Sequence, residues 1–256
     1  MRNILGLFFV CVLVASAADT TSSPQATSAA SGNKFTFVLV HGAFAGGWEW
    51  KKLGEALQRD GHTVYRPTLT GQGERSHLAS RDVDLNLHIK DIVNFILWED
   101  LHDIVLVGHS YGGMVITGVV DQVPDRIKHV IYVDAGLPED GECMFEAVGN
   151  GQKPPSSPDG FLRFPNMKMT SVPHVVPQSE KTFSQPISLH NQKVAQKVPT
   201  TFILTVDKGT DPKLDGFYRS YERAKARGWK TVVMEGDHIV HLTQTNALAQ
   251  LLEQAP

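Results

Sequence analysis

Two kinds of apolar run alternate along the chain. Short, nearly continuous runs of Val, Ile and Leu predict strands that are buried on both faces, as in a parallel sheet. Between them, apolar residues recur every three or four positions and predict amphipathic helices. This alternation is typical of βαβ units and predicts an α/β fold, with a mostly parallel sheet and helices on both faces. The predicted strands are 35–41, 62–66, 104–107, 127–133, 201–206 and 231–234, and the predicted helices are 48–59, 85–98, 114–122, 214–227 and 243–254.

The alternation stops in the Pro-rich stretch of residues 136–197. A long irregular insertion inside one domain is usually functional, and ligand sites of α/β sheets form at the carboxyl ends of the strands. We therefore expect a cap over that edge; the alternative is an excursion into solvent. Phe161, Phe164 and Phe183 either line an apolar acyl or aryl pocket or form the core of the cap.

The amino terminus has the pattern of a targeting segment. A short positive region precedes about a dozen apolar residues and a small-residue cleavage site, which predicts a signal peptide over residues 1–18 and a secreted or periplasmic protein. A retained anchor is the alternative, but a membrane span needs about 20 apolar residues, so we expect no stable membrane anchor. Residues 19–33 are rich in Ser, Thr and Ala and predict a flexible linker before a single domain, residues 34–256.

Composition narrows the classes of partner. The chain is 41% hydrophobic and 20% charged with a net charge of −3, and it lacks a basic tract, so nucleic acid is not an expected partner. Beyond the leader the only cysteine is Cys143, which excludes an internal disulfide and is typical of a buried structural residue. These patterns do not determine the oligomeric state.

The candidate chemistry centres on Ser110 in Gly-His-Ser-Tyr-Gly, residues 108–112. This G-x-S-x-G sequence follows a predicted strand and precedes a predicted helix, which is the context of a nucleophile elbow. There the serine lies on a strained turn with its hydroxyl exposed. The alternative is a plain Gly-rich turn between strand and helix.

A serine nucleophile needs a base that is oriented by an acid, in the chain order Ser, Asp or Glu, His for this kind of fold. His238 follows the last predicted strand and is favoured as the base over His241. Asp207 and Asp134 both end predicted strands, and Asp207 is favoured because its strand is adjacent in sequence to the one before His238. Asp237 is expected to cap its own loop.

Acyl transfer also requires two backbone N–H groups that bind the developing oxyanion. The N–H of Tyr111, directly after the nucleophile, and that of Ala43, in the Gly-rich loop after the first strand, are the candidates. We expect neither a metal nor a cofactor. His238 and His241 are not part of an H-E-x-x-H motif, and Gly71-Gln72-Gly73 lacks the remainder of a phosphate-binding loop.

These motifs resemble the α/β-hydrolase superfamily, in the branch of plant methylesterases, hydroxynitrile lyases and their bacterial relatives. The resemblance covers residues 35–254 and is carried by four segments. They are Phe-Val-Leu-Val-His-Gly-Ala at 37–43, Gly-His-Ser-Tyr-Gly-Gly at 108–113, Thr-Val-Asp-Lys at 205–208 and Gly-Asp-His at 236–238. It implies a serine hydrolase of small-molecule esters in which the acid falls on Asp207, the base on His238 and the oxyanion donors on Ala43 and Tyr111.

The resemblance also separates two chemistries. Hydroxynitrile lyases of this branch have a threonine at the position of Gly42 and a lysine at that of Ile239, and neither is present here. Hydrolysis through an acyl-enzyme is therefore favoured over lysis. A non-catalytic receptor for small ligands on the same scaffold is the remaining alternative, and the apparent triad argues against it.

Overall fold

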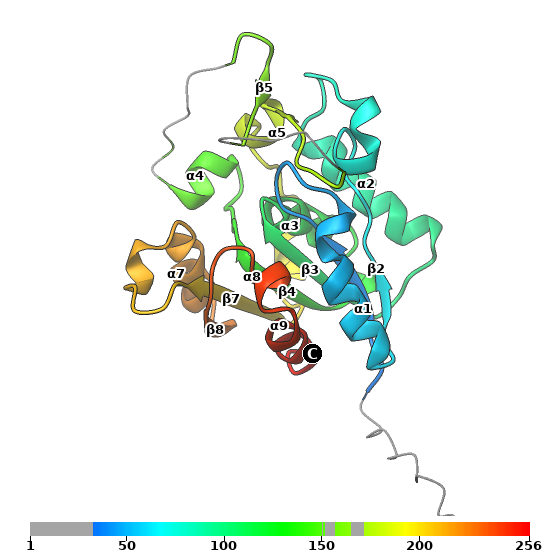
Figure 1. Cartoon of the computed structure of the whole chain (residues 1–256), viewed down its shortest axis with the longest axis vertical. Helices are drawn as coiled ribbons and strands as arrows, with labels where there is room; N and C mark the ends of the chain where they lie inside the picture. The colour runs from blue at the N-terminus through cyan, green and yellow to red at the C-terminus, as the bar shows by residue number, and fades with distance from the viewer. Residues whose placement is uncertain (1–32, 150, 152–156, 165–171) are drawn as a thin grey trace, which may run out of the picture. The chain divides into compact units, whose positions relative to one another are not determined.

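A six-stranded parallel sheet forms the centre of the protein (Figure 1). The computed structural model describes residues 33–149, 151, 157–164 and 172–256, and in these residues the strand order is β2-β1-β3-β4-β7-β8. A short antiparallel pair, β5-β6, lies outside the sheet. The strands are β1 (Thr36–Val40), β2 (Thr63–Tyr65), β3 (Ile104–Ser110), β4 (Ile127–Ala135), β5 (Phe161–Leu162), β6 (Gln178–Ser179), β7 (Thr200–Val206) and β8 (Lys230–Glu235).

Helices connect the parallel strands, and several predicted helices are divided into two. The region predicted at 48–59 begins as a 3₁₀ turn, and the one predicted at 214–227 is interrupted at Asp215, whose carboxylate accepts the N–H of Phe217. The α-helices are α1 (Lys51–Arg59), α2 (Leu85–Trp98), α3 (Gly112–Gln122), α4 (Met144–Val148), α5 (Lys181–Ser184), α6 (Gln192–Ala195), α7 (Tyr218–Ala226), α8 (Val240–Thr243) and α9 (Thr245–Glu253). The 3₁₀ helices are η1 (Gly47–Trp50), η2 (Gly73–Leu78), η3 (Pro124–Arg126) and η4 (Pro212–Leu214).

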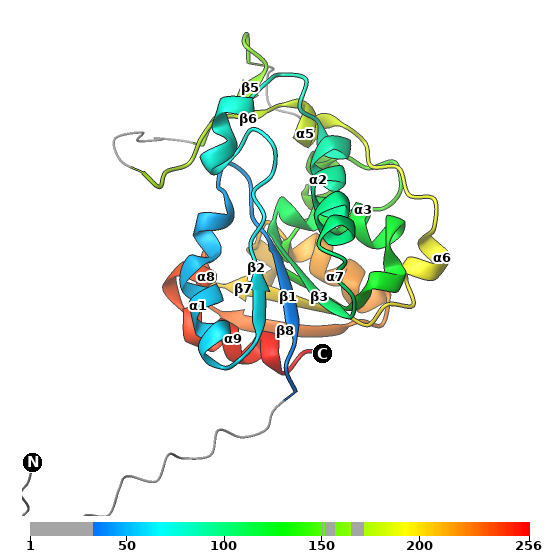
Figure 2. The same cartoon turned by 90° about the vertical axis from the view of Figure 1, so that its right-hand side faces the viewer.

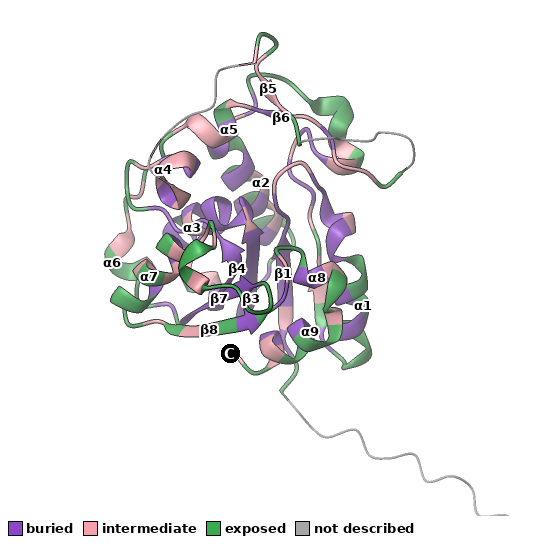
Figure 3. Cartoon of the chain, turned by 60° about the vertical axis from the view of Figure 1, so that its left-hand side comes forward, coloured by how far each residue is buried: buried purple, intermediate pink, exposed green. Residues whose placement is uncertain are grey.

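Each face of the sheet has its own apolar core. In β1, Val38 and Val40 face the layer of α2 and α3, whereas Phe37 and Leu39 face the layer of α1 and α9. Figure 2 shows these helices on opposite sides of the strands, and Figure 3 shows that β3 and β4 are buried between them. This confirms the predicted α/β architecture and explains why the central strands contain nearly continuous apolar runs.

The segment between β4 and β7, predicted as a cap, contains α4, β5, β6, α5 and α6 in its described part. It contacts the loop after β1: Phe44 accepts a hydrogen bond from the N–H of Val176 (2.8 Å) and donates its own N–H to Gln178 Oε1 (2.8 Å). The segment therefore contacts the carboxyl edge of the sheet. Residues 150, 152–156 and 165–171 of this segment lie outside the described residues.

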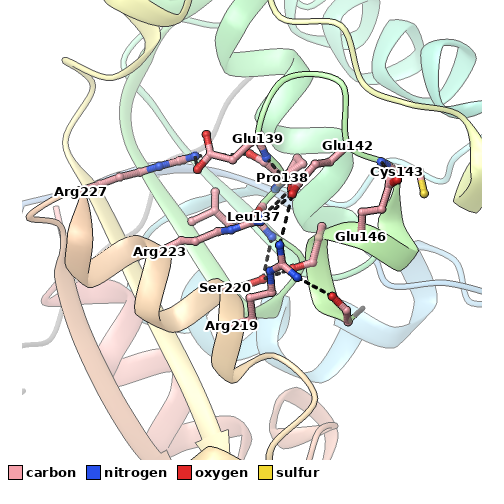
Figure 4. Close-up of polar contacts among 12 residues, drawn as sticks. Leu137, Pro138, Glu139, Glu142, Cys143, Glu146, Arg219, Ser220, Arg223 and Arg227 are labelled. Atoms are coloured by element: carbon pink, nitrogen blue, oxygen red, sulfur yellow. Dashed lines mark hydrogen bonds and ion pairs between the residues drawn. The ribbon is translucent and has the colours of Figure 1, made fainter. Parts of the chain in front are cut away.

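Polar contacts attach the beginning of this segment to α7 (Figure 4). The guanidinium of Arg223 binds both carboxylate oxygens of Glu142 and the carbonyl oxygen of Leu137, while Ser220 Oγ accepts the N–H of Leu137. Burial alone would raise the pKa of Glu142, but the hydrogen bonds from Arg223 lower it. Cys143, next to this cluster, is buried and unpaired by any disulfide in the described residues.

The predicted signal peptide (1–18) and all but the last residue of the predicted linker (19–33) lie outside the described residues. In the part of the chain that is described, none of the helices has both the length and the apolar character needed to span a bilayer.

Candidate active site

Ser110 ends β3 in a strained backbone conformation. Its φ of 53° lies in the left-handed region, which costs a non-glycine residue about 1–3 kcal/mol. Helix α3 begins two residues later, so the chain turns sharply between strand and helix, and Ser110 is partly exposed while its neighbours are buried. This is the geometry expected of a nucleophile elbow.

The elbow can be this tight because glycines follow the serine. A Cβ on Gly112 would lie 2.7 Å from the carbonyl oxygen of Val40, and one on Gly113 would overlap the carbonyl oxygen of Gly136. Any larger residue at these positions would push the start of α3 away from β1 or from the end of β4. The motif therefore fixes the distance between the nucleophile and the neighbouring strand ends.

His238 and Asp134 form the acid–base pair of this edge. His238 Nδ1 lies 2.6 Å from Asp134 Oδ2, and Asp134 Oδ1 accepts the N–H of Thr205 (3.1 Å). Asp134 is fully buried, whereas the His238 side chain is 43% exposed. Because a carboxylate can only accept, His238 carries its proton on Nδ1 and leaves Nε2 free as a base.

The prediction that Asp207 is the partner of this histidine is wrong in the structure. Asp207 is exposed at the end of β7, where its carbonyl oxygen closes a turn with the N–H of Thr210. The physical reason is the sheet order: β4 lies between β3 and β7, so its end is next to the nucleophile. The loop after β8 crosses β7 and places His238 over β4. Asp134, the alternative considered above, holds the position.

Ser110 and His238 are brought together through neighbouring residues. Ser110 pairs in register with Ala135, the residue after Asp134, and His109 Nε2 lies 2.8 Å from the carbonyl oxygen of His238. Within the described residues no hydrogen bond joins the Ser110 hydroxyl to His238. Such bonds are often long before substrate binds and tighten in the complex.

The ring of His238 is fixed by stacking. Phe217 lies parallel to it, with ring centroids 5.1 Å apart and an interplanar angle of 4°. Asp215 lies shortly before Phe217 in the chain. Burial, together with the charge of Asp134, raises the pKa of the Asp215 carboxyl. The sequence offered no signal for Phe217, because an aromatic residue in a predicted helix is more often a core residue.

The segments that carry the two predicted oxyanion donors both adjoin the nucleophile. A Cβ on Gly42 would lie 3.3 Å from Ser110 Cβ, so the loop carrying Ala43 passes directly beside the serine. Across the described residues, the N–H groups of Ala43 and Tyr111 have no recorded acceptor in the protein. Both donors are therefore available to an oxyanion.

His41 orients the peptide that carries the Ala43 N–H. Its Nε2 accepts the N–H of Leu69 (3.0 Å), so its proton is on Nδ1, which donates to the carbonyl oxygen of Gly42 (2.7 Å). Burial lowers the pKa of His41 and favours this neutral form. Because C=O and N–H point in opposite directions in a trans peptide, holding the Gly42 oxygen directs the Ala43 N–H away from His41.

Aromatic side chains continue from the nucleophile into the predicted cap. The ring of Phe183 stacks on Tyr111 (5.2 Å between centroids) and on Phe44 (5.9 Å), while Phe164 contacts Phe44 edge-on and is 54% exposed. The hydroxyl of Tyr111 donates to His88 Nδ1 (3.0 Å). Phe44 and Phe183 thus form an apolar aromatic wall that packs on Tyr111, the residue after Ser110.

Among the described residues, one group of side chains has the donors for a metal ion: Glu49, His109 and His241, whose ligand atoms all lie within 4.8 Å of one another. All three are buried. This cluster is hard to predict from the sequence, because an acidic residue at the start of an amphipathic helix normally faces solvent. Its only signal was the position of Glu49 between two tryptophans, Trp48 and Trp50, of which Trp50 is fully buried.

The model of the "Alpha/beta hydrolase family" matches residues 37–251. The chain belongs to this family. Similar members include a carbendazim hydrolyzing esterase of Nocardioides sp. (strain SG-4G), 35% identical over 239 residues, which covers 84% of this chain and 97% of that protein.

Other family members are similar over less of their length or at lower identity. Methylesterase 2 of Arabidopsis thaliana is 32% identical over 105 residues, 40% of each chain. The solved structure of an extracellular α/β-hydrolase from a Paenibacillus species superposes with a TM-score of 0.69 at 25% identity, and the match covers 86% of this chain and 98% of that one. The resemblance to the methylesterase-like branch is thereby confirmed, and the α/β-hydrolase fold is shown for this chain.

Proposed function

We propose that the protein is a secreted serine esterase that hydrolyses small carboxylic esters with an apolar acyl group. The observation that carries the proposal is the hydrogen bond of 2.6 Å between His238 Nδ1 and buried Asp134, formed at the strand end next to the strained Ser110. The esterases and methylesterases among its relatives support an ester hydrolase, and the extracellular relative is consistent with secretion.

In the proposed reaction, Ser110 Oγ attacks the ester carbonyl carbon while its proton passes to His238 Nε2. Asp134 stabilises the imidazolium through Nδ1–H, and the N–H groups of Ala43 and Tyr111 bind the oxyanion. The C–O bond to the alcohol then breaks, and the alcohol leaves with the proton from His238. A water molecule, deprotonated by His238, attacks the acyl-enzyme and releases the acid, which restores the Ser110 hydroxyl.

The aromatic wall supports flat or apolar acyl groups. Phe44 and Phe183, which are partly exposed, give a surface against which an aryl or short alkyl acyl group can bury its area. Each buried methylene contributes about 0.8 kcal/mol to such binding. The triad itself does not select the bond, so the pocket decides which ester is cleaved.

The test is the hydrolysis of p-nitrophenyl esters and aromatic methyl esters by the protein lacking residues 1–18, beside Ser110→Ala. Full activity of Ser110→Ala would disprove the assignment of the nucleophile. Mandelonitrile cleavage, assayed in parallel, tests the lyase alternative. A threonine at Gly42 would bring its Cβ to 2.8 Å from His109 Nδ1, so this site does not accept the lyase residue without moving its neighbours.

A further inference from the structure

The carboxylate of Glu49, in η1, is buried between the loop after β1 and His109, the residue before the nucleophile. Its side chain is 7% exposed, and its recorded contacts are the N–H of Gly42 and the imidazoles of His109 and His241. Burial alone would raise the pKa of Glu49, but the two imidazoles hold it well below its usual range. A buried carboxylate is costly unless several groups compensate it, so its contacts define the geometry around it.

The first contact acts on the oxyanion loop. Glu49 Oε1 accepts the N–H of Gly42 at 2.8 Å, and the next peptide is held at the Gly42 oxygen by His41. Two successive peptides are thus fixed, one by Glu49 and one by His41. The N–H of Ala43 belongs to the second of them, so its direction depends on both.

The second contact acts on the loop of the base. Because a carbonyl oxygen only accepts, His109 Nε2 donates its proton to the oxygen of His238 (2.8 Å), which leaves Nδ1 facing Glu49 Oε1 at 3.6 Å. Burial lowers the pKa of His109 to about 4. In this neutral form Nδ1 has no proton and, among the described residues, no hydrogen-bond partner. His109 therefore links Glu49 to the main chain of His238 by packing between them, with a hydrogen bond only on the side of His238.

The third contact reaches the helix after the base. His241 Nε2, in α8, lies 3.8 Å from Glu49 Oε2, and its ring lies 4.4 Å from that of His109. Neither ring nitrogen of His241 has a hydrogen-bond partner in the described residues. The carboxylate of Glu49 lies close to this ring, and its charge offsets part of the cost of burying the two nitrogens without hydrogen bonds.

We propose that Glu49 is a positioning residue for ester hydrolysis: one buried carboxylate fixes the loop of the oxyanion donor Ala43 and, through His109 and His241, the loop of His238. This inference rests on the proposed function. Since a displacement of about 1 Å at a catalytic group reduces turnover by about a hundredfold, the loss of this link should appear in kcat rather than in substrate binding.

The experiment compares Glu49→Ala, Glu49→Gln and the control Glu55→Gln, which removes an exposed carboxylate from α1. Esterase kinetics are measured per active site, counted by exhaustive fluorophosphonate labelling, together with affinity for phenylboronic acid, which forms a tetrahedral adduct with serine. We expect Glu49→Ala to lower kcat by about ten- to a hundredfold, with KM within about twofold and boronate affinity reduced in parallel with kcat.

Glu49→Gln keeps its oxygen for the N–H of Gly42 and places its NH₂ group at the position of Oε2, which lies 3.8 Å from His241 Nε2. It should therefore recover at least tenfold of the lost kcat, while Glu55→Gln should match the wild type. If Glu49→Ala does not fold, Glu49→Gln and Glu49→Asp test the inference in its place. The aspartate side chain is too short to reach both loops, so Glu49→Asp should have a lower kcat than the wild type. Unchanged kcat in Glu49→Ala, or a loss confined to KM, would overturn the inference.

Two further outcomes are distinguished. Metal analysis of the wild-type protein should find no stoichiometric metal, and one equivalent of metal that is lost in His241→Ala would replace this inference by a metal site. If the wild type cleaves no ester, or Ser110→Ala cleaves it equally well, it is the proposed function that fails. If the wild type is active and Ser110→Ala is not, the Glu49 variants test the positioning role alone.

Discussion

Replacing Asp134 by Asn changes the location of a proton with little change in the shape of the site. Asp134 Oδ1 accepts the N–H of Thr205, which can only donate, so the amide oxygen of the asparagine must stay there. Its NH₂ group then faces His238 Nδ1, which has to become an acceptor. The neutral imidazole carries its proton on Nε2 in this tautomer and can no longer take a proton from Ser110.

The size of the effect follows from that loss. In the same acid-to-amide substitution of a serine protease, the wrong tautomer lowers kcat about 10⁴-fold. Here we expect about 10³- to 10⁴-fold, or about 4–5.5 kcal/mol at about 1.36 kcal/mol per tenfold change. The KM should change little, because the fully buried Asp134 does not touch substrate.

The assay is p-nitrophenyl ester hydrolysis at constant pH, with Asp207→Asn as the matched control. Asp207 is exposed and has no recorded contact with His238 in the described residues, so its variant should retain kcat within about twofold. The reasoning is refuted if Asp207→Asn loses more than tenfold while Asp134→Asn stays active. In that case the base would turn to β7 in the working enzyme.

Two predictions concern stability. Burial lowers the pKa of His88 to about 4, below its value of about 6.5 in the unfolded chain. The contribution of neutral His88 to the free energy of unfolding is therefore complete above pH 6.5 and is lost as the pH falls to about 4, a change of up to about 3 kcal/mol. We expect the free energy of unfolding, measured with urea at several pH values, to change less steeply with pH in this window for His88→Gln than for the wild type. An equal pH dependence in the two proteins would contradict the assignment. Arg223→Met leaves Glu142 without its main partner and should destabilise the protein by about 1–3 kcal/mol, whereas Lys225→Met at an exposed pair should change stability by less than about 0.5 kcal/mol. Equal effects of these two variants in thermal unfolding would show that the contact with α7 is unimportant.

The sequence predicted the sheet and the nucleophile because both depend on local patterns. A run of Val and Ile identifies a strand, and Gly112 has to be glycine wherever the elbow forms. The acid depends on which strand ends are neighbours in space, and adjacency in sequence pointed to Asp207 rather than to Asp134. Glu49 could not be found for a similar reason, since its burial results from the approach of loops that are distant in the chain.

Backbone strain separates the two acids independently of hydrogen bonding. Five described non-glycine residues have positive φ, and three of them, Phe44 (65°), Ser110 (53°) and Asp134 (45°), follow or end the adjacent strands β1, β3 and β4. Each costs about 1–3 kcal/mol and persists only where the surrounding structure determines it. Phe44 follows the oxyanion donor Ala43, Ser110 is the nucleophile and Asp134 is the acid. Asp207 is outside this set, so the strained edge and the hydrogen bond to His238 select the same carboxylate.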